Sequence, residues 1–170
     1  MLNKIAIVIS SKKFRDEEYQ EPRTALEKAG FTITLYSTSL NPANGMFGAI
    51  AKPDKLINEM KPDNYDGIVF IGGSGASEYF ENPEAHKLVV DFNSKKKLVA
   101  AICIAPMILA KAGILKGKKV CAFSSVKDGI RKMGGDIQPD GVVVDGNILT
   151  ATGPEFAAQF GVALVKYLNN

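Results

Sequence analysis

Ala101 and Ala105 flank Cys103, each two positions away, at the point where an apolar run ends. The run Leu98–Ile102 has the composition of a strand buried on both faces, and Pro106 suits the first turn of a helix, where its missing N–H needs no partner. A nucleophile between small residues at a strand-to-helix turn is the pattern of a nucleophile elbow, here with Cys in place of Ser. A helix starting directly below would favour the thiolate. The pattern therefore predicts a reactive cysteine.

Three carboxylates, Asp16, Glu17 and Glu18, follow the first predicted strand and open the first predicted helix, at the same sheet edge as the elbow. A carboxylic acid hydrogen-bonded to the sulfur would stabilise the thiolate, provided that burial keeps the acid protonated. Acids in the first turn of a helix also complement its dipole, and this interpretation fits Asp16 and Glu17 well. The residue pattern leaves open which of the three reaches Cys103.

Gly72 and Gly73 end the predicted strand Gly67–Ile71. A diglycine at this place forms a plain turn, or it presents backbone N–H groups to an oxyanion together with the N–H of Ile104, the residue after the nucleophile. The spacing of a phosphate-binding loop is absent. Taken together with the elbow, the diglycine is a candidate oxyanion site.

A cysteine nucleophile usually borrows a histidine as its base, and this chain has one histidine, His86. It falls on the predicted helix Glu84–Ser94 in surroundings typical of a protein surface. A cysteine–histidine protease mechanism is therefore not expected. Cys121 lies in the middle of a predicted strand, and we expect it in the core rather than as a resolving thiol.

The 170 residues carry a net charge of +3, and 46% of them are apolar. This length allows one well-buried core, so we expect a single domain over residues 1–170. The lysines have no interleaved aromatic residues for base stacking, which argues against a nucleic-acid partner. No apolar run approaches the roughly 20 residues of a membrane span, and two cysteines without a secretion signal favour a cytoplasmic protein. We expect neither a metal nor a cofactor.

Apolar strand-like runs alternate with helical patterns along the whole chain. Strands are predicted at 5–10, 32–37, 67–71, 98–102, 119–123, 142–144 and 148–150, and helices at 19–29, 53–60, 84–94, 106–112, 125–133 and 155–168. Asp145-Gly146-Asn147 predicts a hairpin turn, and 41–52 a loop that shapes the pocket. The prediction is an α/β fold with a mostly parallel sheet, helices on both faces, and the elbow at the carboxyl ends of the strands, where such sheets bind ligands.

Five features together resemble the DJ-one/PfpI superfamily, which contains the PfpI-type intracellular proteases and the Parkinsonism-associated deglycase. They are Glu18 four residues before Pro22, the diglycine, the elbow, the segment Asp145–Thr150, and Gly153-Pro154 before the last helix. The resemblance spans nearly the whole chain. It implies a flavodoxin-like three-layer α/β sandwich that forms a homodimer or a larger homo-oligomer.

The resemblance also implies roles for individual residues. Cys103 would be the nucleophile and an oxidation-sensitive thiol, and Glu18 the acid that touches its sulfur. The backbone N–H groups of Gly73 and Ile104 would be the oxyanion donors. Glu78 is similar to a glutamate that in the protease branch reaches the neighbouring subunit's site.

Two departures from the family pattern bear on the activity. Ile104 stands where the protease branch places a histidine, and Phe123 stands where the deglycase branch has one. This favours a cofactor-independent cysteine enzyme of the glyoxalase or deglycase type that acts on small reactive carbonyl compounds, with Glu18 as proton shuttle. The alternative is a redox-responsive stress or chaperone-like protein whose Cys103 is oxidised without turnover. A PfpI-type protease or amidase ranks third, because no histidine follows Cys103.

Overall fold

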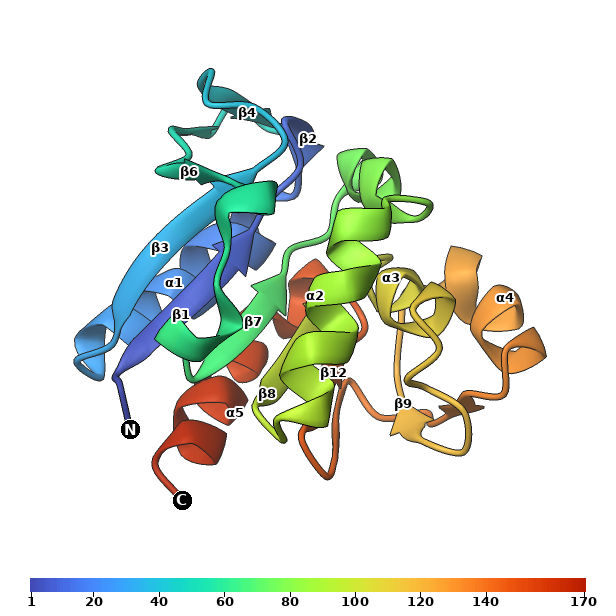
Figure 1. The fold of residues 1–170 in the computed structure, drawn as a ribbon. Helices are drawn as coiled ribbons and strands as arrows, with labels where there is room; N and C mark the ends of the chain where they lie inside the picture. Colours follow the sequence, from blue (N-terminus) through green and yellow to red (C-terminus); the bar gives the residue numbers. More distant parts are fainter.

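A sheet of seven strands forms the centre of the computed structural model, which describes residues 1–170 (Figure 1). The strand order is β11-β12-β8-β7-β1-β3-β6, and every neighbouring pair is parallel except β11 and β12. These strands span Lys4–Val8 (β1), Thr32–Ser37 (β3), Lys55–Leu56 (β6), Gly67–Phe70 (β7), Leu98–Ile102 (β8), Val142–Asp145 (β11) and Ile148–Ala151 (β12). The predicted parallel sheet and the predicted hairpin between the last two strands are both confirmed.

Helices cover both faces of the sheet, so the fold is a three-layer α/β sandwich. Helices α1 (Asp16–Lys28) and α5 (Ala157–Leu168) pack together on one face, and α2 (Pro83–Ser94) and α3 (Pro106–Lys111) lie on the other (Figure 1). Successive residues of β1 point alternately into the two apolar clusters, as a strand buried on both faces requires. The short helix α4 (Lys127–Lys132) lies beyond α3.

The predicted loop 41–52 contains two short strands. Strands β4 (Ala43–Gly45) and β5 (Ile50–Ala51) form an antiparallel hairpin, and β4 also pairs with β2 (Lys12–Phe14), which lies just before α1. This small sheet lies beyond the carboxyl ends of the central strands (Figure 1). It therefore stands next to the edge where the elbow is expected.

The predicted helix 53–60 is wrong. The structure has strand β6 there, followed by a 3-10 turn at Ile57–Glu59. Strand β6 pairs in parallel with β3, and the Asp54 carboxylate accepts a hydrogen bond from the N–H of Leu35 at 2.8 Å. The open edge of β3 thus holds this segment in an extended form.

The predicted strand 119–123 does not join the main sheet. Only β9 (Lys119–Val120) is a strand, and it pairs with β10 (Asp136–Ile137) in a separate two-stranded sheet. The N–H of Cys121 donates to the hydroxyl of Thr150 at 3.0 Å rather than to a strand backbone. The Thr150 hydroxyl therefore takes the N–H that would continue strand β9 past Val120.

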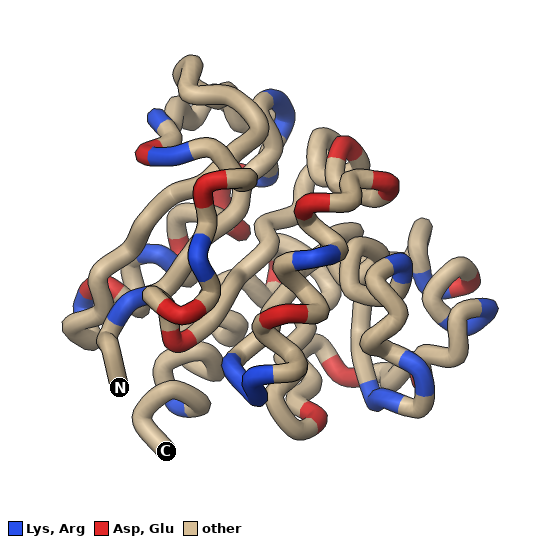
Figure 2. Tube along the Cα trace, viewed as in Figure 1, with Lys and Arg blue, Asp and Glu red and all other residues tan.

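Basic and acidic residues are interspersed along the chain (Figure 2). Around β9 and α4 the lysines are dense, but Lys118 pairs with Asp145 and Arg131 pairs with Asp128. None of the helices is both long and apolar enough to cross a membrane.

Candidate active site

Cys103 occupies a sharp turn between β8 and α3. It has a φ of +66°, a left-handed conformation that few non-glycine residues adopt. Hydrogen bonds fix the turn on both sides: the N–H of Cys103 donates to the Ala151 carbonyl at 3.0 Å, and its own carbonyl accepts from the N–H of Phe123 at 2.8 Å. This is the backbone conformation of a nucleophile elbow, in which strain is kept by the surrounding structure.

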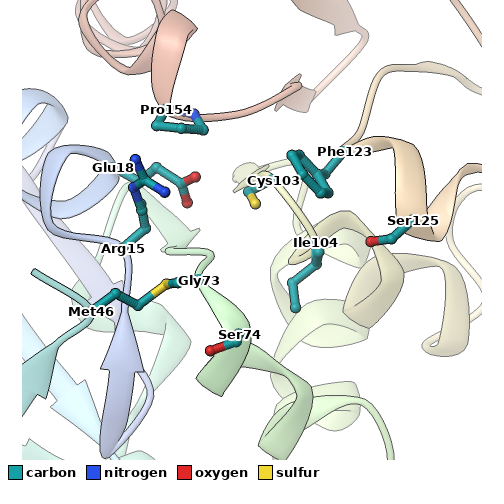
Figure 3. A pocket seen from close by; sticks show the side chains of 10 residues that line it. All are labelled: Arg15, Glu18, Met46, Gly73, Ser74, Cys103, Ile104, Phe123, Ser125 and Pro154. Atoms are coloured by element: carbon teal, nitrogen blue, oxygen red, sulfur yellow. The ribbon is translucent and has the colours of Figure 1, made fainter.

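Glu18 lies fully buried on α1 and faces the sulfur of Cys103 (Figure 3). Neither carboxylate oxygen has a protein partner at full hydrogen-bond geometry. Burial is the main cause that raises the pKa of Glu18 to about 7, and the Cys103 thiol and the Gly72 backbone approach closely enough to oppose this rise. A buried carboxylate with so little hydrogen bonding is costly, so the carboxyl holds a proton over part of the neutral range.

The other two acids of the first turn have different contacts. Asp16 accepts hydrogen bonds from the N–H groups of Phe47 and Ala49 in the β4–β5 turn, at 2.9 and 2.7 Å. Glu17 forms an ion pair with Arg15 at 2.7 Å and is half-exposed. The structure thus separates the three acids that the sequence pattern leaves together, and Glu18 is the one beside the thiol.

The Cys103 thiol does not have the lowered pKa expected from a helix start. Its side chain is buried, and burial followed by the negative charge of Glu18 raises the pKa of Cys103 to about 12. Backbone hydrogen bonds from Gly73 and Ile104 act in the opposite direction. Helix α3 begins only at Pro106 and has six residues, so its dipole does not outweigh burial. The thiol needs a base to become nucleophilic.

The diglycine makes room for this pair. A Cβ on Gly72 would collide with the Glu18 carboxylate and would lie 2.5 Å from the Cβ of Cys103. Gly73 has a φ of +97°, and a Cβ there would meet the backbone of the β2–α1 segment. The N–H of Arg15 in that segment donates to the Gly72 carbonyl at 3.0 Å. Neighbouring atoms therefore leave no room for a side chain at Gly72 or Gly73, and the positive φ of Gly73 favours glycine as well.

A cavity of about 350 Å³ opens over the sulfur (Figure 3). It is lined by Arg15, Glu18, Met46, Gly73, Ser74, Cys103, Ile104, Phe123, Ser125 and Pro154. The four predicted site residues Cys103, Glu18, Gly73 and Ile104 thus lie together. Ile104 and Phe123 give apolar walls at the positions where relatives are expected to carry histidine, and no histidine lines the cavity.

Three other residues singled out by the sequence lie elsewhere. The Glu78 carboxylate accepts hydrogen bonds from the N–H and hydroxyl of Ser11, both at 2.9 Å, and from the hydroxyl of Thr38 at 3.1 Å. His86 is on α2, as predicted, with Nε2 2.8 Å from the Phe80 carbonyl. Cys121 is buried in the core.

Met46 comes from the loop 41–52 that is predicted to shape the pocket, and Pro154 from the Gly153-Pro154 motif, whereas Arg15, Ser74 and Ser125 are lining residues that the sequence analysis does not mark. Arg15 directly precedes the three acids, and that position is the one signal that could have marked it. Ser74 and Ser125 come from segments that only the tertiary fold brings to this edge. Among the ionisable residues of the chain, no group of three or more His, Cys, Asp or Glu side chains is arranged to hold a metal ion.

Comparison with known proteins agrees with this fold. The model of the DJ-1/PfpI family matches residues 3–167. An uncharacterized protein from Methanocaldococcus jannaschii is 40% identical over 166 residues, which cover 96% of this chain and 81% of that protein. The crystal structure of a ThiJ/PfpI domain protein from Brachyspira murdochii has a TM-score of 0.96 at 34% identity, covering 98% of this chain and 96% of that one. The crystal structure of Drosophila melanogaster DJ-1beta has a TM-score of 0.89 at 28% identity, and the match covers 97% of this chain and 90% of that one.

The fold and the elbow define an α/β protein with a flavodoxin-like sheet and a cysteine at its carboxyl edge. The chain belongs to the DJ-1/PfpI family. The resemblance inferred from the sequence is thereby confirmed.

Proposed function

We propose that this protein is a cofactor-independent cysteine enzyme that converts small reactive carbonyl compounds, in the manner of a glyoxalase. The observation that carries the proposal is the pair of Cys103 and Glu18, a nucleophile with a buried acid–base group of pKa about 7 beside it. Such a group works best when its pKa lies near the operating pH, because it can then both accept and donate a proton. A thiol whose own pKa is raised needs a base of this kind when it attacks.

In the first step the Cys103 sulfur bonds to the aldehyde carbon of a 2-oxoaldehyde, and the π bond of the carbonyl breaks. The thiol proton passes to the Glu18 carboxylate and from there to the new alkoxide oxygen, which gives a hemithioacetal. The backbone N–H groups of Gly73 and Ile104 would donate to this oxygen while it carries negative charge. No electrons are gained or lost overall.

In the second step the Glu18 carboxylate removes the proton from the hemithioacetal carbon and an enediolate forms. The hydroxyl proton moves to the neighbouring oxygen, and Glu18 returns the abstracted proton to the neighbouring carbon, which yields a thioester of a 2-hydroxy acid. The aldehyde carbon is oxidised and the ketone carbon is reduced by the same electron pair. Water then hydrolyses the thioester, which releases the 2-hydroxy acid and restores the Cys103 thiol. Methylglyoxal would give lactate by this route.

The test is lactate formation from methylglyoxal, followed by NMR. Wild-type protein is expected to form lactate, Cys103→Ala to form none, and Glu18→Gln to lose about 10²- to 10⁴-fold in kcat, the range for loss of a general base. Cys121→Ser is the matched control, because it changes the other, buried thiol, and it should keep full activity. Lactate from Cys103→Ala, or none from the wild type, would refute the proposal.

A second candidate is a redox-responsive protein whose Cys103 is oxidised to the sulfinate without turnover. The observation that favours it is the set of donors around the sulfur: the N–H groups of Gly73 and Ile104, and the Glu18 carboxyl when protonated. Peroxide treatment followed by peptide mapping tests it. Cys103 should gain two oxygen atoms before any methionine is oxidised, and the opposite order would reject this function.

A PfpI-type protease or amidase has less support. That mechanism relies on a histidine beside the nucleophile, and the cavity has Ile104 and Phe123 instead. The single histidine, His86, lies on α2 and contacts the Phe80 carbonyl. We therefore do not propose peptide hydrolysis.

A further inference from the structure

Arg15 is the one basic residue that lines the cavity around Cys103 (Figure 3). Its Nε and Nη2 donate to the Glu17 carboxylate at 2.7 and 3.5 Å, and its guanidinium lies 4.5 Å from the ring centroid of Phe47. Nη1 donates to no protein group. An ion pair along one edge and an aromatic ring on one face therefore hold the guanidinium, and its remaining edge is open to a ligand.

The charge of the cavity favours an anionic ligand. Glu17, which balances Arg15, does not line the cavity, so the only other charged lining residue is Glu18. Because burial raises the pKa of Glu18 to about 7, this carboxyl is neutral over part of the physiological range, and Arg15 then supplies the only full charge. The apolar side chains Met46, Ile104 and Phe123 also line the cavity and add no competing charge.

We infer that Arg15 is a specificity-determining residue that selects substrates with a carboxylate or a similar small anionic group near the reacting carbonyl. The inference rests on the proposed function in that Cys103 attacks the carbonyl carbon. The substrate class is then a 2-oxoaldehyde with a terminal carboxylate. Guanidinium binds a carboxylate through paired N–H donors, which orients the far end of the substrate while its aldehyde meets the sulfur. The anionic group takes no part in the bond changes, so the reaction balances as for methylglyoxal.

Anion selection can be measured without any turnover. Iodoacetate and iodoacetamide have the same reactive carbon and nearly the same shape, but only iodoacetate carries a negative charge. The ratio of their alkylation rates at Cys103, divided by the ratio for free cysteine in the same buffer, therefore reports how the cavity treats an anion. We expect Arg15→Gln to lower this ratio by about fivefold, equivalent to about 1 kcal/mol for a partly exposed ion pair.

Two further variants separate a local effect from a general one. Glu17→Gln frees Arg15 from its ion pair and is expected to raise the ratio. Arg131→Gln removes the same charge from an exposed pair with Asp128, outside the cavity, and is expected to leave the ratio unchanged. Added salt should reduce the preference of the wild type, because exposed charges are screened. An equal effect of Arg15→Gln and Arg131→Gln would overturn the inference.

A substrate pair distinguishes this inference from the proposed function. We expect 4,5-dioxopentanoate, a 2-oxoaldehyde with a carboxylate, to be converted to 2-hydroxyglutarate with a higher kcat/KM than methylglyoxal to lactate, and Arg15→Gln to abolish that advantage. In one outcome, the wild type and Arg15→Gln both convert the two compounds and show the same preferences for iodoacetate and for 4,5-dioxopentanoate. That result overturns the inference and leaves the proposed function standing. Loss of the iodoacetate preference in Arg15→Gln without turnover of either compound overturns the proposed function and leaves the anion site.

Discussion

The Glu18 carboxyl and the Cys103 thiol share one buried corner of the cavity, so a negative charge on either opposes a second charge on the other. Burial is the first cause of the raised pKa of both groups. The residue pattern alone predicts a thiolate stabilised by a helix. The structure instead has a thiol beside a base, because its side chain is almost enclosed and the helix starts three residues later. Proton transfer within the pair therefore controls the reactivity of the sulfur.

Glu18→Gln should stabilise the protein above pH 7. The pKa of this carboxyl rises from an ordinary value of 4.5 to about 7 on folding. Its contribution to stability is therefore fully present below about pH 4.5 and is lost as the pH rises through 7, whereas glutamine does not ionise. Urea denaturation should show the advantage of the variant growing from pH 4 to pH 8 by roughly 3 kcal/mol. A difference that is constant with pH would contradict the raised pKa.

At the scale of elements, one carboxylate holds the β4–β5 hairpin against the site. Asp16 is buried and accepts hydrogen bonds from the N–H groups of Phe47 and Ala49. Gly45 passes so close that a Cβ there would lie 2.6 Å from the Asp16 carboxylate. Because Met46 lines the cavity, Asp16 fixes the position of one wall.

Asp16→Ala is expected to loosen this hairpin without unfolding the central sheet. It leaves two backbone N–H groups without their acceptor, at a cost of about 1–3 kcal/mol. Hydrogen exchange at Phe47 and Ala49 should become faster, while β8 keeps its protection. Glu21→Gln is the control, since that residue is exposed on the same helix. Unchanged exchange at Phe47 in Asp16→Ala would show that the hairpin is held by other contacts.

The long buried elements could be predicted from the sequence, and β3 and β8 have the predicted bounds. The short strands β2, β4 and β5 could not, because two or three residues carry no periodicity and tertiary contacts decide their pairing. The same limit applies to the acids of α1. Successive helical residues point about 100° apart, so Asp16, Glu17 and Glu18 meet three different environments. Only the placement of α1 against the sheet shows which of them faces the thiol.

At the scale of the whole molecule, the site is assembled from segments spread over most of the chain. Arg15, Gly73, Cys103, Phe123 and Pro154 follow different elements and meet at the carboxyl edge of the sheet, where parallel α/β folds bind their ligands. The position of Glu18 in turn depends on how α1 packs against α5. The contacts between α1 and α5, far from the cavity, therefore help to place Glu18 beside the thiol.

Gly161→Ala tests how closely α1 and α5 are packed. A Cβ at Gly161 on α5 would lie 2.9 Å from the Cβ of Ala25 and 3.0 Å from the Cα of Pro22, both on α1. Although alanine favours helix by about 1 kcal/mol, we expect thermal unfolding to show a net loss of about 1–3 kcal/mol from overpacking. Val162→Ala on the exposed side of α5 should change stability little. A stabilised Gly161→Ala protein would mean that the two helices move apart at no cost.

The central claim is that Glu18 controls the sulfur of Cys103, and the pH dependence of Cys103 alkylation by iodoacetamide tests it most directly. Peptide mapping follows Cys103 in the wild type and in Glu18→Gln, with the fully buried Cys121 as internal reference. In the wild type the rate should rise with pH through a midpoint near 7, because the ionised carboxylate accepts the thiol proton. In Glu18→Gln that midpoint should disappear. The same midpoint in both proteins would contradict the claim.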